Sequence, residues 1–172
     1  TDIVELDVNA LEVGHNQSTV FWQRQFENDP EQQIHRSYKL FWIWLSKTWF
    51  VNDAVSRNPF KSTVFVWSDI GSFRQPGNYN IKMVRHPDIV PKNAMLLMAY
   101  KPLRATHLSQ WFDKQHGELF LSGAHMAGTK NTWMVFHAQF LQVFHEYVES
   151  SFFVGDDQPL LQTTCMQQQN LC

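Results

Sequence analysis

The chain lacks a long hydrophobic run and any excess of basic residues. No stretch reaches the length of about 18 apolar residues that a membrane-spanning helix needs, and residues 1–20 lack the basic-then-apolar order of a signal peptide. Charged residues make up only 17% of the 172 residues, and a net charge of -2 gives no electrostatic footprint for nucleic acid. We therefore expect no nucleic-acid partner and no membrane segment in this chain.

Cysteine is also scarce. Cys165 and Cys172 are close enough in sequence to close a small disulfide loop, and two free thiols suit the same spacing equally well. The redox compartment therefore stays open. No repeat or linker divides the chain, so its length predicts a single domain over residues 1–172. Aromatic residues are abundant at 15%, and such rings build cores and also stack on sugars and nucleotides.

Predicted strands and helices alternate along the chain. Hydrophobic periodicity predicts strands over residues 2–8, 62–68, 94–100 and 118–122, and helices over residues 18–27, 37–57, 106–116, 129–149 and 156–168. Proline and glycine predict a turn over 75–79, and small residues predict a loop over 123–128. The alternation favours an α/β fold, with a sheet flanked by helices.

The segment from Val64 to Arg74 is the most informative one for function. Three β-prone residues run into Trp67 and end at Ser68 and Asp69, which is typical of a strand that delivers one carboxylate to the edge of a sheet. Gly71 allows a sharp turn, and Arg74 is a fixed cation that suits phosphate. Asp69 is thus a candidate metal or sugar ligand. Alternatively, it is a loop residue that caps the next turn.

Lys47 interrupts an apolar stripe of the predicted long helix. That stripe contains Leu40, Ile43, Phe50 and Ala54. A buried ammonium group costs several kcal/mol unless a carboxylate or phosphate pairs with it. The partner is then either a protein Asp or an anionic ligand, unless Lys47 extends to the edge of the helix.

Two further segments place polar groups at helix starts. The predicted loop around Gly123 offers free backbone N–H groups, although Thr129 is equally well explained as the N-cap of the next helix. His125 in this loop has no spaced partner, which makes it weak evidence for a metal. Asp156 and Asp157 precede Gln158 at the start of the last helix, where one acid can cap the helix while the other points elsewhere.

Four stretches, taken in this order, resemble the HtrL/YibB family of glycosyltransferase-like proteins, which are related to the GT-A nucleotide-sugar transferases. The stretches are Tyr38–Phe60 with its Asn-Pro-Phe end, Val64–Arg74 with its Trp-x-Asp-x-Gly core, Ser122–Trp133, and Phe153–Leu161 with Asp157 and Gln158. The resemblance implies a GT-A-like, Rossmann-like mixed sheet flanked by helices. It also implies transfer of a sugar from a nucleotide-diphospho-sugar donor to a carbohydrate or glycoconjugate acceptor.

The same resemblance assigns roles to residues. Asp69 takes the place of the metal-binding Asp-x-Asp motif and would hold Mn²⁺ or Mg²⁺ against the donor diphosphate. Trp67 stands where the first Asp of that motif would be, so a single carboxylate remains. The donor would be bound by Lys47, Trp67, Asp69, Gly71, Arg74 and Gly123, and the catalytic residues would be Asp157 and Gln158.

Residues 1–37 are shorter than the nucleotide-binding start of a GT-A domain. We therefore expect part of that segment to be absent from this chain. This expectation favours the alternative to an active transferase, which is a non-catalytic fragment or pseudoenzyme that binds sugars or nucleotide sugars. A metal-dependent phosphoesterase would need more clustered carboxylates or histidines than the sequence contains.

Overall fold

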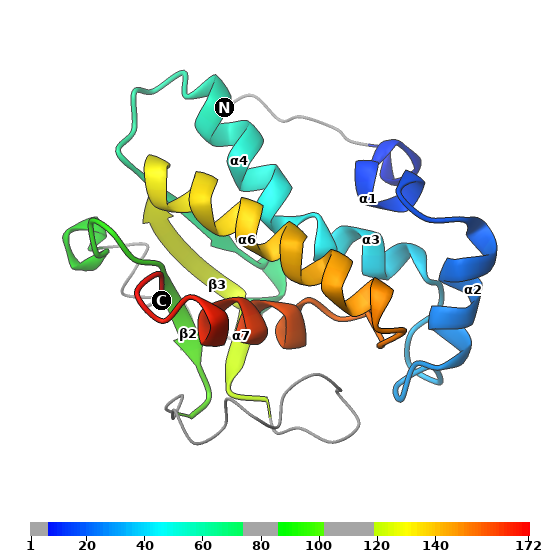
Figure 1. Cartoon of the computed structure of the whole chain (residues 1–172). Helices are drawn as coiled ribbons and strands as arrows, with labels where there is room; N and C mark the ends of the chain where they lie inside the picture. Colours follow the sequence, from blue (N-terminus) through cyan, green and yellow to red (C-terminus); the bar gives the residue numbers. More distant parts are fainter. Residues whose placement is uncertain (1–6, 74–85, 102–118) are drawn as a thin grey trace.

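The computed structural model describes residues 7–73, 86–101 and 119–172 (Figure 1). Within these ranges the chain is a mixed α/β protein in which helices pack around a small sheet, as the alternating pattern predicted. The predicted turn over 75–79 and the predicted helix over 106–116 lie outside the described residues. So does most of the predicted strand over 2–8, whose last residue instead begins the 3₁₀ helix η1, Val8–Ala10.

The sheet has three strands in the order β1-β3-β2, where β1 is Val64–Ser68, β2 is Leu96–Ala99 and β3 is Leu121–Thr129. Both pairs of neighbours are antiparallel. The predictions of strands over 62–68 and 94–100 are therefore confirmed. The mixed sheet that the resemblance implied is not what the described residues form, since all of their strand pairing is antiparallel.

The loop predicted over 123–128 is wrong, because these residues form most of the central strand β3. On one side β3 pairs with β1, with Ser68 opposite His125 and Val64 opposite Thr129. On the other side the register of β2 jumps, so that Leu97 faces Met126 while Met98 faces Ser122. Small residues suggest a loop when read alone, but two neighbouring strands supply the hydrogen bonds that decide the structure. The register jump leaves a bulge at residues 123–125.

The helix predicted over 37–57 is two helices, α3 (Lys39–Leu45) and α4 (Lys47–Arg57), which meet at Ser46. The break changes which side chains are buried: Ile43 is 41% exposed, whereas Phe41, Leu45, Val51 and Val55 are in the core. The predicted apolar stripe is therefore wrong, although Lys47 itself is buried. Because the helix breaks at Ser46, the buried face of α3 does not continue in register along α4, and a single helical period does not fit both.

The other helices follow their local signals. Helices α1 (Glu12–His15) and α2 (Thr19–Glu27) come first, and the hydroxyl of Ser18 caps α2. Short 3₁₀ helices follow β1 and precede β2, namely η2 (Ile70–Phe73) and η4 (Pro87–Ile89). Thr129 caps α6 (Lys130–Glu149), and Asp156 caps α7 (Asp157–Gln167). Each cap satisfies N–H groups that the first turn of a helix leaves without a partner.

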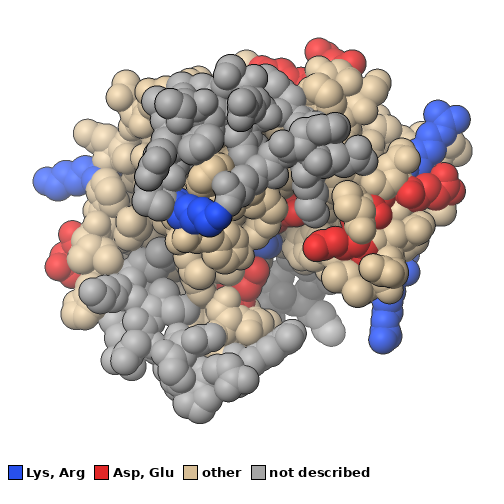
Figure 2. Space-filling view, turned by 90° about the horizontal axis from the view of Figure 1, so that it is seen from below, with Lys and Arg blue, Asp and Glu red and all other residues tan. Residues whose placement is uncertain are grey.

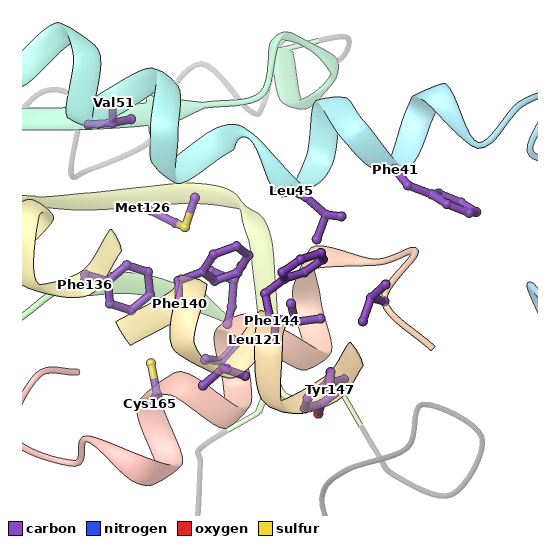
Figure 3. Close-up of a cluster of buried hydrophobic side chains, with 14 of the residues drawn as sticks. Phe41, Leu45, Val51, Leu121, Met126, Phe136, Phe140, Phe144, Tyr147 and Cys165 are labelled. Carbon is purple, nitrogen blue, oxygen red and sulfur yellow. The ribbon is translucent and has the colours of Figure 1, made fainter. Parts of the chain in front are cut away.

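The core lies where α6 crosses the sheet between α4 and α7 (Figure 1). The spacing of three or four residues that predicted the helix over 129–149 is that of the buried face of α6, whose members are all fully or almost fully buried: Trp133, Phe136, Phe140, Val143, Phe144 and Tyr147. Figure 3 shows the rings of Phe136, Phe140, Phe144 and Tyr147 gathered with Leu45 of α3, Leu121 and Met126 of β3, and Cys165 of α7. One continuous cluster thus fixes α3, β3, α6 and α7 against one another.

The end of the chain is fastened in two ways. Cys165 and Cys172 form a disulfide with a Cα–Cα distance of 5.4 Å, which decides between the two alternatives that the spacing left open. The backbone N–H of Met95 donates to the carbonyl of Leu171 at 2.7 Å, which joins the C-terminus to the start of β2. No helix in the described ranges has the length and apolar character needed to cross a membrane.

Candidate functional site

The site is built around the ammonium group of Lys47, at the first position of α4. Lys47 is only 5% exposed. Its Nζ lies 2.9 Å from Asp157 Oδ2 and 3.3 Å from Asp69 Oδ2, and it donates to the carbonyl oxygen of Gly123 at 3.2 Å. Three oxygens therefore surround a group that has three hydrogens to donate. Of the partners considered for Lys47, the structure shows protein carboxylates.

Asp69 follows β1 directly and is held from several sides. Its backbone N–H donates to the carbonyl of Ala124 at 2.9 Å, which continues the pairing of β1 with β3. Its Oδ1 accepts a hydrogen bond from Trp67 Nε1 at 2.8 Å, and its Oδ2 faces Lys47. The Trp67 ring is itself stacked on Phe50, with centroids 5.9 Å apart. Trp67 therefore positions the carboxylate of Asp69.

Gly123 lies in the β3 bulge, directly against Asp157. A Cβ atom at position 123 would overlap the Asp157 carboxylate. Because β2 does not pair with residues 123–125, the carbonyl of Gly123 is available to Lys47. The bulge thus supplies both the space for the carboxylate and the backbone acceptor for the ammonium.

The two adjacent acids at the start of α7 have different roles, as predicted. Asp156 Oδ1 accepts from the N–H of Gln158 at 3.0 Å and caps the helix. Asp157, the first helical residue, turns its side chain to Lys47. The side-chain amide of Gln158 donates to the hydroxyl of Tyr100 at 3.4 Å, a long hydrogen bond at the exposed edge of the site.

Burial determines the electrostatics of the ion pair between Lys47 and Asp157. Desolvation raises the pKa of Asp157 to about 7, helped by the charge of Asp156 and opposed by that of Lys47. Desolvation also works against the charge on Lys47, but the carboxylates of Asp157 and Asp69 outweigh it and raise the pKa of Lys47 above its ordinary value. The site therefore contains a permanent ammonium group beside a carboxyl group that exchanges its proton near neutral pH.

Lys47, Asp69, Gly123, Asp157 and Gln158 line a cavity of about 300 Å³. Other described residues in its wall are Glu31, His35, Trp44, Tyr100, Ser122 and Asp156. Carboxylates therefore outnumber cations, and two aromatic rings face the same space. Seen from below, the Lys and Arg side chains of the described surface are scattered, with no continuous basic patch on this face (Figure 2).

The wall residue His35 and its partner behind the wall, Asp29, were not among the predicted site residues. The Asp29 side chain is fully buried, and its Oδ2 lies 2.5 Å from His35 Nδ1. Their separation of six residues does not match the helical period, and both lie in the connection between α2 and α3, outside any helix or strand. Only the fold brings the pair to the cavity, so no local pattern in the sequence identifies it.

Of the predicted donor-binding residues, one is not brought to this cavity and another lies outside the part of the chain that the structure describes. Gly71 lies within η2 and is not part of the cavity wall, and Arg74 lies outside the described residues. His125 is also elsewhere: its Nδ1 shares a hydrogen with the hydroxyl of Ser68 at 2.8 Å, and burial lowers its pKa. The wall thus contains Lys47, Asp69, Gly123, Asp157 and Gln158 of the predicted set, with Trp67 behind Asp69.

The groups around Asp69 offer few ligands for the metal predicted there. No group of three His, Cys, Asp or Glu side chains that could hold a metal occurs within residues 7–73, 86–101 and 119–172. Both oxygens of Asp69 already have protein partners, and the nearest charge is an ammonium group. These residues do not fit a Mn²⁺ or Mg²⁺ site by themselves. A metal at Asp69 stays a prediction.

Comparison with protein families identifies the chain's relatives. A family described as "Bacterial protein of unknown function (HtrL_YibB)" matches residues 12–171. The chain belongs to the HtrL/YibB family. Among curated proteins and among solved structures, nothing matches. The match covers every element that carries the site, from α3 to α7, and it gives no activity to this HtrL/YibB chain.

Proposed function

We propose that the chain transfers a glycosyl group from a nucleotide-diphospho-sugar to a hydroxyl group of a carbohydrate or glycoconjugate at the Lys47 cavity. One observation carries the proposal: Lys47, Asp69, Gly123 and Asp157 come from four distant segments and meet at one cavity. Aromatic rings beside carboxylates are what a sugar requires, since the rings contact its C–H faces and the carboxylates accept from its hydroxyls.

Each group has a role in this proposal. Asp69 is held by Trp67 and its side chain is one-third exposed, so it is suited to orient the donor sugar. Asp157 and Gln158 serve the acceptor side. Lys47 fixes both carboxylates and is not a free cation for the diphosphate, because two acids already balance its charge. Arg74 remains the predicted phosphate partner. A GT-A-like arrangement of the fold is part of the same proposal.

The runner-up is a protein that binds sugars without turnover. The observation that favours this alternative is the excess of carboxylates over basic groups in the cavity wall. The described wall offers a diphosphate only Lys47 and His35, against several carboxylates. A neutral sugar would suit this wall better than a dianion would. The two proposals differ in whether nucleotide sugars bind and react.

The first prediction concerns Asp69. We expect Asp69→Asn to abolish transfer, because the amide keeps the shape of the side chain but loses its charge, while the thermal midpoint stays nearly unchanged. Asp53→Asn is the matched control, since the Asp53 side chain is equally exposed at 34% and also pairs with a cation, Arg57. Product analysis by mass spectrometry and a thermal melt measure the two effects.

Calorimetric titration with a panel of uridine- and guanosine-diphosphate sugars, with and without Mn²⁺, separates the proposals. Binding with product formation supports the transferase. Binding of free sugars alone favours the runner-up. If the protein binds no nucleotide sugar under any condition, the transferase proposal fails. A large loss of stability in Asp69→Asn would show a structural role for that carboxylate.

A further inference from the structure

Asp29 and His35 form a buried pair behind and in the cavity wall, and neither residue has a role in the proposed function so far. Asp29 Oδ1 accepts from the backbone N–H of Glu31 at 2.9 Å, while Oδ2 faces His35 Nδ1. Both oxygens of a fully buried carboxylate are thus engaged, and the carboxylate cannot turn away from the imidazole. His35 in turn is part of the cavity wall.

The arrangement fixes the state and the plane of the His35 ring. A carboxylate at Nδ1 holds the hydrogen on that nitrogen, which leaves the lone pair on Nε2. The ring stands edge-on to Trp44, with centroids 5.0 Å apart, and edge-on to Phe41 at 6.3 Å. Glu31 Oε2 lies 3.8 Å from Nε2, which is beyond hydrogen-bond distance. Nε2 is therefore an oriented acceptor at the cavity.

Of the other acids of the wall, Glu31 lies beside His35 itself, with Oε2 3.8 Å from Nε2, and the remaining three are committed elsewhere. Asp157 Oδ2 lies against Lys47, both oxygens of Asp69 are engaged, and Asp156 caps α7. A general base needs a lone pair that points at the proton it removes. Among these groups His35 meets that condition best.

We propose that His35 is the catalytic base of the transfer and that Asp29 is its positioning residue, an inference that rests on the proposed function. Nε2 takes the proton of the acceptor hydroxyl while that oxygen forms a bond to the anomeric carbon. The bond from this carbon to the diphosphate oxygen breaks, and its electron pair leaves on the nucleoside diphosphate. A single displacement of this kind inverts the anomeric configuration.

The state of the ring is tested without any substrate. Long-range ¹H–¹⁵N spectra of the labelled protein, recorded over a series of pH values, are expected to show the hydrogen of the neutral His35 ring on Nδ1. In Asp29→Asn the two tautomers are expected to mix, because the amide no longer requires a donor at Nδ1. A neutral ring with its hydrogen on Nε2 in the unchanged protein overturns the inference whether or not the protein is a transferase.

The catalytic role is tested by His35→Gln. We expect kcat to fall about 10² to 10⁴-fold, with donor affinity within about threefold of the starting value and partial rescue by added imidazole. His145→Gln, an exposed change on α6, is the control and is expected to leave kcat unchanged. Product of inverted configuration supports the single displacement, and retained configuration overturns it.

The outcomes keep this inference apart from the proposed function. If the unchanged protein transfers no sugar, the proposed function fails and the base assignment fails with it, whereas an active protein whose His35→Gln variant keeps its kcat overturns only the base assignment. If His35→Gln does not fold, Asp29→Asn replaces it, since it retains the imidazole. A kcat lowered at least tenfold by Asp29→Asn then supports the role, and an unchanged kcat contradicts it.

Discussion

Two cavities flank the first turn of α4, and they differ in what lines them. The larger, of about 400 Å³, lies between α1, α4 and α6 and is walled by apolar side chains such as Leu45, Trp49 and Phe140. The smaller, of about 300 Å³, is walled by the Lys47 cluster, defined as Lys47, Asp69 and Asp157. The adjacent residues Lys47 and Thr48 face different cavities. Lys47 lines the smaller one, whereas Thr48 is hydrogen-bonded at 3.0 Å to His137, which lines the larger one.

The meeting of polar groups, more than volume, distinguishes the candidate site from the larger cavity. Burial lowers the pKa of His137 near the larger cavity, against the weaker opposing effect of Glu12, so this imidazole is neutral at neutral pH. In the smaller cavity the same cost of burial falls on groups that pair with one another. Charges kept at such a cost, in a cavity open to a ligand, favour a functional role. The predictions below test that contrast.

The largest expected effect is that of Lys47→Met. Removing the ammonium leaves Asp157 buried without its counter-charge, and we expect a loss of about 3 to 5 kcal/mol in the free energy of unfolding. Urea unfolding measures it. Lys130→Met, at the exposed first position of α6, is the matched control and is expected to change the free energy by less than about 0.5 kcal/mol. Equal effects of the two changes would show that the buried ion pair contributes nothing to stability.

A second effect depends on pH and belongs to Asp157. Its pKa is about 7 in the folded chain and 3.8 as an ordinary value, so between these values the folded state holds a proton that the unfolded state has released. Stability must therefore fall as the pH rises through this window, by up to about 1.4 kcal/mol per pH unit. The raised pKa of Lys47 acts elsewhere, because the stability it contributes is present below its ordinary pKa of 10.5 and is lost only above it.

The Asp157→Asn variant isolates this titration. The amide does not titrate, so the difference in unfolding free energy between the unchanged protein and the variant reports the Asp157 proton alone. We expect the unchanged protein to lose stability relative to the variant from pH 4 to pH 7. A difference that is constant over this range would mean that Asp157 is ionised throughout, as a carboxylate fully compensated by Lys47.

Local signals predicted those parts of the fold that local interactions decide. Thr129 was considered as an N-cap because it lies directly before an apolar-periodic run, and it caps α6. The helix predicted over 18–27 begins at Ser18, whose hydroxyl caps α2. The helix over 129–149 could be predicted from its apolar spacing because α6 is long and keeps one face on the core. The division of roles between Asp156 and Asp157 follows from the directions that adjacent helical residues take.

Other parts depend on contacts between distant segments. Residues 123–128 contain small side chains, and only pairing with β1 and β2 makes them a strand. The break at Ser46 turns the face of α3 relative to that of α4, so a single period misplaced Ile43. For the site, the sequence indicated Lys47, Asp69 and Asp157 separately. That they form one cluster, and that His35 lies at the same cavity, are properties of the tertiary structure.

The smallest expected effect comes from Thr48→Val, which keeps the shape of the side chain beside Lys47 but changes the larger cavity. The variant removes the hydrogen bond between Thr48 Oγ1 and His137 Nδ1, and we expect a loss of about 1 kcal/mol in the free energy of unfolding. Affinity for a nucleotide sugar is expected to stay the same, because Thr48 is not part of the wall of the smaller cavity. Calorimetry measures the affinity and urea unfolding the stability. A weakened affinity without a loss of stability would show that the two cavities are coupled through the first turn of α4, and the contrast drawn between them would then be wrong.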